Sequence, residues 1–159
     1  MAFKRHHFQP DSPTNNFATL NPLDKGSQVD LADGNLVPTW NGVSGHSVRS
    51  SMRFPKTGKW YLEVCVNGNA SMGVIDSSKR IVPSSGGLWP GADGFGEGGS
   101  YALAPDGQKV SNGGYGSFLS SLSAGNIVKV LYDADFGILQ FGVESGNLTT
   151  AYTLSLIHI

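Results

Sequence analysis

The clearest strand signal in this chain is the stretch KWYLEVCV, residues Lys59–Val66. Apolar side chains occupy every second position from Trp60 onward, and Asn67-Gly68 supplies a turn signal at the end. Alternation with a period of two is typical of a strand that buries one face. One face carries Trp60, Leu62, Val64 and Val66, and the other carries Tyr61, Glu63 and Cys65.

A second strand and its hairpin partner lie further along the chain, at Ile127–Tyr132 and Ile138–Val143. Asp135-Phe136-Gly137 turns the chain between them. We expect the Trp60 and Val130 strands to supply two apolar sheet surfaces that pack on each other and form a platform for loops. The predicted inward residues of the hairpin are Val128, Val130, Tyr132, Leu139, Phe141 and Val143.

Weaker apolar runs separated by turn residues indicate further short strands. Asp33-Gly34 between two such runs predicts another hairpin. No segment shows helical periodicity, and short strands at regular spacing indicate an antiparallel two-sheet β-sandwich, so the expected fold class is all-β. The weaker runs are Gln28–Leu31, Asn35–Trp40, His46–Met52, Met72–Ile75, Tyr101–Leu103 and Gln108–Ser111.

Composition agrees with this interpretation and excludes several functions. The 159 residues suit one domain, and the 22 glycines favour tight turns over long helices. The net charge is −1 and no basic stripe is present, so nucleic-acid binding is not expected. No apolar run reaches the roughly 20 residues of a membrane helix, the N-terminus does not resemble a signal peptide, and the single Cys65 precludes an internal disulfide.

Three segments are expected along the chain. Residues 1–22 are a polar lead-in, residues 23–153 form the sandwich domain, and residues 154–159 form a tail. We interpret this tail, LSLIHI, as non-natural, because translation of a common sequencing-adapter end produces the same six residues. The natural chain would then continue beyond Thr153 and complete the sandwich. The alternative is a genuine final strand.

Four motifs in order resemble the SPRY domain family. The resemblance covers roughly Gly58 to Gly146, with departures at Asn126 and at Glu144-Ser145-Gly146. It implies a bent lectin-like sandwich of the concanavalin A type that binds proteins or peptides through loops at one end and is not an enzyme. The motifs are Gly58–Val64 with Gly73-Val74, Tyr101 with Asp106–Val110 and Asn112-Gly113, Ala124–Asp135, and Ile138–Phe141.

The lead-in segment Pro13–Leu23 resembles the sequence that precedes SPRY-like domains in structural proteins of tailed phages. This resemblance implies a virion-associated or tail-associated protein of viral, metagenomic origin.

Several possible catalytic or ligand motifs have simpler explanations. Gly94–Gly99 satisfies GxGxxG, but no strand–helix context for a dinucleotide surrounds it. Asp133 and Asp135 could act as paired carboxylates or bind calcium, yet turn chemistry explains them, as it explains Asp106. Cys65 is interpreted as a small core residue, and no metal site, cofactor or catalytic residue is expected.

The long loop Asp76–Gly99 is the best candidate for a binding surface. Aromatic side chains on adaptable loops above a rigid sandwich commonly form binding sites. The alternative is that Trp89 folds back and caps the core. The candidate ligand-binding residues are Leu88, Trp89, Asp93 and Phe95 in this loop and Tyr115 in the following one.

The expected function is a non-enzymatic recognition module that binds a protein or peptide ligand. A carbohydrate-binding module is an alternative, because Trp89 could stack on a sugar while Asp93 and Asn112 hydrogen-bond to it. A structural decoration domain is another. A glycoside hydrolase would need two suitably separated carboxylic groups on a concave face, and Asp133 and Asp135 sit at a turn instead.

Overall fold

The computed structural model describes residues 17–41, 46–78, 99–111 and 114–154. All regular elements in these ranges are strands, and none of the described residues is helical. The strands are β1 (Leu20–Lys25), β2 (Val29–Ala32), β3 (Val37–Trp40), β4 (Val48–Ser50), β5 (Lys59–Cys65), β6 (Met72–Ile75), β7 (Ser100–Leu103), β8 (Gln108–Ser111), β9 (Gly114–Ser117), β10 (Ile127–Asp133), β11 (Ile138–Val143) and β12 (Thr149–Thr153).

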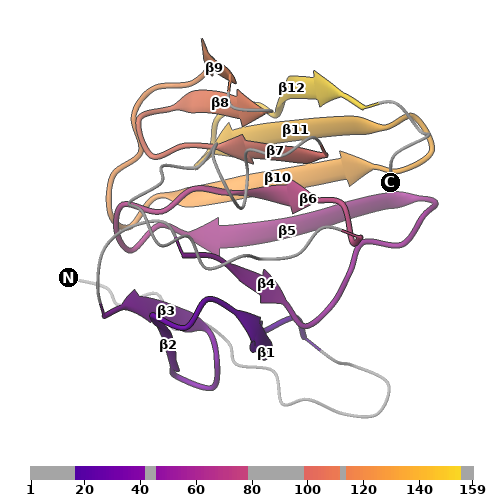
Figure 1. The fold of residues 1–159 in the computed structure, drawn as a ribbon. Coiled ribbons are helices and arrows are strands. Elements are labelled where there is room, and N and C mark those ends of the chain that lie inside the picture. Colours follow the sequence, from indigo (N-terminus) through magenta and orange to yellow (C-terminus); the bar gives the residue numbers. More distant parts are fainter. Residues whose placement is uncertain (1–16, 42–45, 79–98, 112–113, 155–159) are drawn as a thin grey trace.

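Two antiparallel sheets form the body of the molecule (Figure 1). The first sheet has the order β12-β11-β10-β5, and the second sheet has the order β6-β7-β8-β9. The pairs β1-β4 and β2-β3 form two small additional sheets. The expected all-β, antiparallel sandwich is therefore confirmed.

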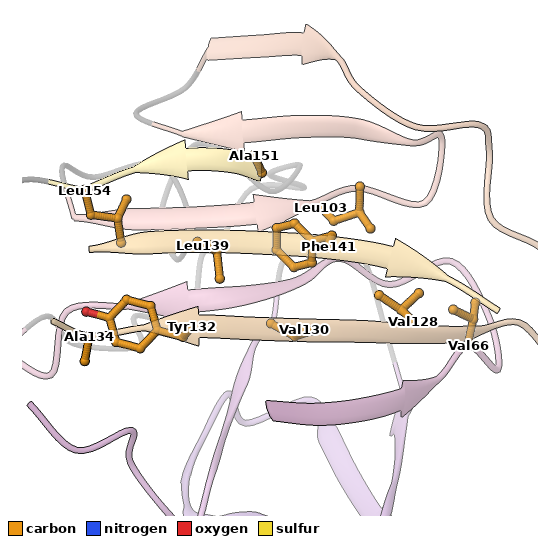
Figure 2. Packing of buried hydrophobic residues seen from close by; sticks show 10 residues of the cluster. All are labelled: Val66, Leu103, Val128, Val130, Tyr132, Ala134, Leu139, Phe141, Ala151 and Leu154. Carbon is orange, nitrogen blue, oxygen red and sulfur yellow. The ribbon is translucent and has the colours of Figure 1, made fainter. Parts of the chain in front are cut away.

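The core lies between the two sheets, and the first sheet supplies most of it. Val128, Val130, Leu139 and Phe141 are each at most 3% exposed, and Leu103 from β7 of the second sheet joins the same cluster. Figure 2 shows these side chains converging in one layer. The alternation predicted for the β10–β11 hairpin is thus confirmed, because the apolar face of the hairpin is the buried one.

One prediction about the core was wrong. The Trp60 and Val130 strands do not supply opposing surfaces, because β5 pairs with β10 in the same sheet, with Trp60 opposite Tyr132 and Leu62 opposite Val130. The opposing surface comes from β6 and β7. Trp60 is also 37% exposed, since β5 forms the edge of its sheet and neighbours cover its side chain on one side only.

A lysine occupies the seam between the two sheets. Lys109 of β8 donates from Nζ to the carbonyl oxygen of Ala151 in β12, at 3.2 Å. Its Nζ also lies 5.5 Å from the centre of the Tyr152 ring and 5.9 Å from that of Phe118. The aromatic faces attract the cation, and the lysine stem covers apolar surface. This arrangement ties β8 to β12 where backbone pairing does not.

Three strands were not predicted from the sequence. β1 contains Pro22 and begins inside the segment assigned to the lead-in, β9 is glycine-rich, and β12 is rich in threonine. None of them shows an apolar alternation, so only their pairing with β4, β8 and β11 identifies them as strands. The predicted β2–β3 hairpin is confirmed, with Ala32 opposite Val37.

The chain after β12 contributes to the core in this structure. Leu154, the first residue of the segment interpreted as a non-natural tail, is 5% exposed and packs in the main cluster. Its backbone N–H donates to the carbonyl oxygen of Gly137 at 2.6 Å. Residues 155–159 and 1–16 lie outside the described residues.

Gly107 shows why one turn requires glycine. Its φ is +83°, and a Cβ there would lie 2.2 Å from the carbonyl oxygen of Leu119. The N–H of Leu119 donates to the carbonyl oxygen of Gly107 at 2.8 Å, so the two backbone segments must stay this close. The predicted turn at Pro105-Asp106-Gly107 is confirmed, and Asp106 Oδ1 accepts a hydrogen bond from the N–H of Gln108.

The core assignment predicts a large stability difference between two phenylalanines. Phe141→Ala should lower the free energy of unfolding by about 3–5 kcal/mol, because Phe141 is fully buried. Phe136→Ala should cost less than about 0.5 kcal/mol, because Phe136 is 66% exposed. Urea unfolding followed by tryptophan fluorescence measures both, and equal losses would contradict this core.

The inter-sheet seam predicts a dependence of stability on alkaline pH. Burial is the main cause that raises the pKa of Tyr152 from 10.0 to about 12, and the nearby Tyr101 adds to the rise. Tyr152 then ionises in the unfolded chain before it does in the folded one. The stability that the raised pKa of Tyr152 contributes is fully present below pH 10 and is lost as the pH rises toward 12.

Between pH 9 and pH 11 the unfolding free energy of the parent chain should therefore fall by up to about 1 kcal/mol more than that of Tyr152→Phe. Urea midpoints measured at both pH values for the two proteins provide the comparison. Parallel pH profiles would show that Tyr152 ionises equally in the folded and unfolded states.

Candidate ligand-binding surface

The second sheet is interrupted at one end by a long connection. Ile75 of β6 pairs with Ser100 of β7, and the N–H of Asp76 donates to the carbonyl oxygen of Gly99 at 2.9 Å. Asp76 Oδ1 also accepts a hydrogen bond from the N–H of Ser78. The predicted loop therefore begins at Asp76, after β6, and ends at Gly99, before β7. These two residues are hydrogen-bonded to each other at one end of the second sheet.

The turn between β10 and β11 lies at the same end of the sandwich (Figure 1). The ring of Tyr101, one residue into β7, packs edge-on against Tyr152 with ring centres 5.0 Å apart. Tyr152 in turn pairs with Leu139, one residue from the start of β11. We call this end, defined by Asp76, Gly99 and the turn residues 134–137, the loop-bearing end.

Phe136 stands exposed on this turn, and the backbone around it is held by hydrogen bonds. Its side chain is 66% exposed, whereas its N–H donates to Asp133 Oδ1 at 3.2 Å. Asp135 Oδ1 accepts from the N–H of Gly58 at 2.9 Å, and Gly137 accepts from Leu154. An aromatic ring on a fixed turn can bind an apolar group with little loss of conformational entropy.

Asp133 is the buried polar centre of this turn. Its Oδ2 lies 3.2 Å from Nζ of Lys59, and its side chain is 7% exposed, against 67% for Lys59. Burial raises the pKa of the neighbouring Tyr132 hydroxyl, and the Asp133 charge adds to that rise. Both Asp133 and Asp135 are therefore engaged in turn structure, as the sequence predicted.

Tyr115 lies in strand β9, so its prediction as a loop residue was wrong. The glycines on either side of it give this strand the composition of a turn. Tyr115 pairs with Val110 and is 48% exposed. Val110, Ala102 and Ser100 point away from the main core and are nevertheless fully buried. Tyr115 therefore lies on the outer face of the second sheet, next to side chains that are buried there, and near the loop-bearing end.

The other predicted ligand-binding residues fall in a range that the structure does not describe. Leu88, Trp89, Asp93 and Phe95 lie in residues 79–98, as does most of the GxGxxG motif, and Asn112 lies in the range 112–113, which is also not described. Their role in binding stays a prediction.

One further sequence interpretation, the one for Cys65, was wrong. Cys65 is exposed and is not a core residue, because it shares the outer face of the edge strand β5 with Tyr61 and Glu63. His46 is 9% exposed, close to Gly26. Within the described ranges, no group of three His, Cys, Asp or Glu side chains could hold a metal ion, and no helix could cross a membrane.

Phe136 is the residue of this surface that sequence analysis did not single out. The signal was present, since Asp135-Phe136-Gly137 places a large apolar side chain in a turn where small polar residues prevail. The sequence alone did not show that the turn belongs to the same end as the Asp76–Gly99 connection. That neighbourhood arises from the packing of one sheet on the other.

Comparison with known proteins supports the architecture. No protein-family model matches the chain, and no curated protein matches it either. Among solved structures, the PSpry domain of TRIM65 matches with a TM-score of 0.60, covering 92% of this chain and 86% of that one at 20% identity. The all-β sandwich described above is therefore a SPRY-like fold.

The burial of Asp133 in the turn predicts that substitution of this residue lowers the stability of the fold. Asp133→Ala should lower the free energy of unfolding by about 1–3 kcal/mol, because it removes an ion pair and leaves the Phe136 N–H without its acceptor. Asp106→Ala, in an exposed turn, should cost less than about 1 kcal/mol. Urea unfolding tests the pair, and equal losses would contradict a buried structural role for Asp133.

Proposed function

We propose that this chain is a non-enzymatic recognition module that binds a protein or peptide ligand at its loop-bearing end. The observation that carries the proposal is Phe136, exposed on a turn whose neighbours are all hydrogen-bonded. Tyr115 adds a second exposed aromatic group near that end. Exposed aromatic residues on a rigid frame are the usual anchors of protein interfaces.

The chemistry of the described surface supports binding over catalysis. The two carboxylates of the turn accept backbone hydrogen bonds, and Asp133 is buried against Lys59. A carboxylate committed in this way lacks the access to a substrate that acid–base catalysis requires. The low charge of the chain fits an apolar contact surface better than a site for nucleic acid.

The resemblance of Pro13–Leu23 to lead-ins of tailed-phage proteins supports a place in a virion or tail-associated assembly. In that setting the module would attach a structural protein to a protein or surface ligand. The predicted loop residues Leu88, Trp89, Asp93 and Phe95 would extend the Phe136 and Tyr115 surface. Detection of the chain in purified virions by mass spectrometry would test this placement.

The binding proposal can be tested with peptides selected on the immobilised full chain from a random display library. Phe136→Ala should weaken most of the selected peptides by about tenfold or more, as expected for an exposed aromatic anchor. Leu23→Ala is the matched control, because Leu23 is 95% exposed but lies in β1. Isothermal calorimetry with the synthetic peptides measures the affinities.

Trp89→Ala distinguishes binding from core capping in the same experiment. It should weaken the selected peptides while the urea midpoint stays unchanged. Peptides that bind Phe136→Ala, Tyr115→Ala and Trp89→Ala as tightly as the parent chain would contradict the proposed surface. Binding on a glycan array together with failure to select any peptide would contradict a protein ligand.

A further inference from the structure

The edge strand β5 has an unpaired side. It pairs with β10 through seven consecutive residue pairs, from Lys59 opposite Asp133 to Cys65 opposite Ile127. Among the described residues, no second strand pairs with β5, and no backbone hydrogen bond leaves residues 59–65 on the other side. An edge of this kind presents a row of unpaired N–H and C=O groups to another chain.

The other edges of the two sheets are less suited to pairing. β12 has a register shift where it meets Leu139 and Gln140, which bends the strand. β6 and β9 have four residues each, and two of the four residues in β9 are glycine. β5 has seven residues in continuous register and contains neither proline nor glycine. It is therefore the edge on which an added strand would gain most backbone hydrogen bonds.

The sequence of β5 is complementary to itself. Around Tyr61, Lys59 and Glu63 occupy symmetric positions with opposite charges, and Trp60 and Leu62 occupy symmetric apolar positions. We propose that the partner of this edge is a second copy of the chain, paired antiparallel through β5 with the twofold axis at Tyr61. The start of β5 borders the loop-bearing end at Lys59, but this interface does not depend on the proposed ligand.

The proposed register places each charge opposite its complement. Lys59 lies opposite Glu63 of the second copy, and this pair occurs twice because the axis is twofold. Both side chains are on the outer face and are exposed, so the contact needs no burial of an unpaired charge. The Lys59 side chain is 67% exposed, so its Nζ keeps donors for the second carboxylate while it remains paired with Asp133.

Apolar side chains would be covered by the same pairing. Trp60, 37% exposed, lies opposite Leu62 of the second copy on the core-facing side, and the two Tyr61 rings meet at the axis on the outer side. Tyr61 is 52% exposed and donates from its hydroxyl to Glu63 Oε1 at 2.6 Å. Aromatic and aliphatic cross-strand pairs of this kind stabilise a sheet.

Neighbouring registers lack this match. An axis at Leu62 would place Lys59 opposite Cys65 and Tyr61 opposite Glu63, so neither charge would face its complement. An axis between two residues would place core-facing side chains opposite outward-facing ones. The axis at Tyr61 therefore defines one structure, in which four strands from each copy form a continuous sheet.

A cysteine placed on the axis tests both the interface and its register. In the full chain carrying Cys65→Ser, we expect Tyr61→Cys to form a cross-linked dimer under mild oxidation, because directly opposite residues bring two Cα atoms within disulfide range. The parent chain with its native Cys65 should not cross-link, since Cys65 would lie opposite Thr57 of the second copy. Non-reducing electrophoresis measures both.

Charge reversal provides an independent test in solution. Sedimentation equilibrium of the parent chain should show a monomer–dimer equilibrium, and Glu63→Lys should weaken the dimer about tenfold or more, because two attractive pairs become repulsive. Lys59→Glu also places two like charges opposite each other, and circular dichroism shows whether this variant stays folded without the Lys59–Asp133 ion pair. Mixing the two variants should restore association as a heterodimer, because each Lys then faces a Glu.

A parent chain that stays monomeric up to millimolar concentration would overturn the proposal, as would a dimer whose affinity is unchanged by Glu63→Lys. Cross-linking of native Cys65 at a rate equal to that of Cys at position 61 would overturn the register. Circular dichroism of Glu63→Lys confirms that the variant is folded, which is expected because Glu63 is exposed.

Discussion

The packing of two apolar sheet surfaces on each other holds this molecule together. Phe141, Leu139 and Val130 of the first sheet and Leu103 of the second sheet are nearly or fully inaccessible to water, and they belong to one cluster. The chain has one cysteine, which is unpaired, so burial of this surface has no covalent support. Each surface element described above, from the β10–β11 turn to the edge of β5, is positioned by this contact.

Charged groups secure the margins of the sandwich where apolar packing ends. Lys109 closes the seam between β8 and β12 by bonding to Ala151 and lying against two rings. Asp133 closes the opposite margin by joining β5 to the β10–β11 turn through Lys59. Both charges have partners, which buried or half-buried ionic groups require. The exposed Phe136 is presented by the second of these arrangements.

Two exposed features of this fold suit two different kinds of contact. The loop-bearing end offers isolated aromatic side chains, which fit a pocket or an apolar patch on a ligand. The edge of β5 offers backbone groups in register, which fit only another extended strand. The two features meet at Lys59, whose partner Asp133 belongs to the β10–β11 turn.

Period-two patterns in the sequence by themselves determined that β5, β10 and β11 are strands and which face of β10 and β11 is buried. They could not determine which strand is central and which is an edge, because alternation reports the side of a residue and not its neighbours. Trp60 and Val130 have the same pattern, yet one is half-exposed and the other is buried. Strands without apolar alternation, the exposure of Phe136 and of Cys65, and the meeting of distant turns at one end were decided only by tertiary structure, since pairing and sheet packing join residues that are far apart in the chain.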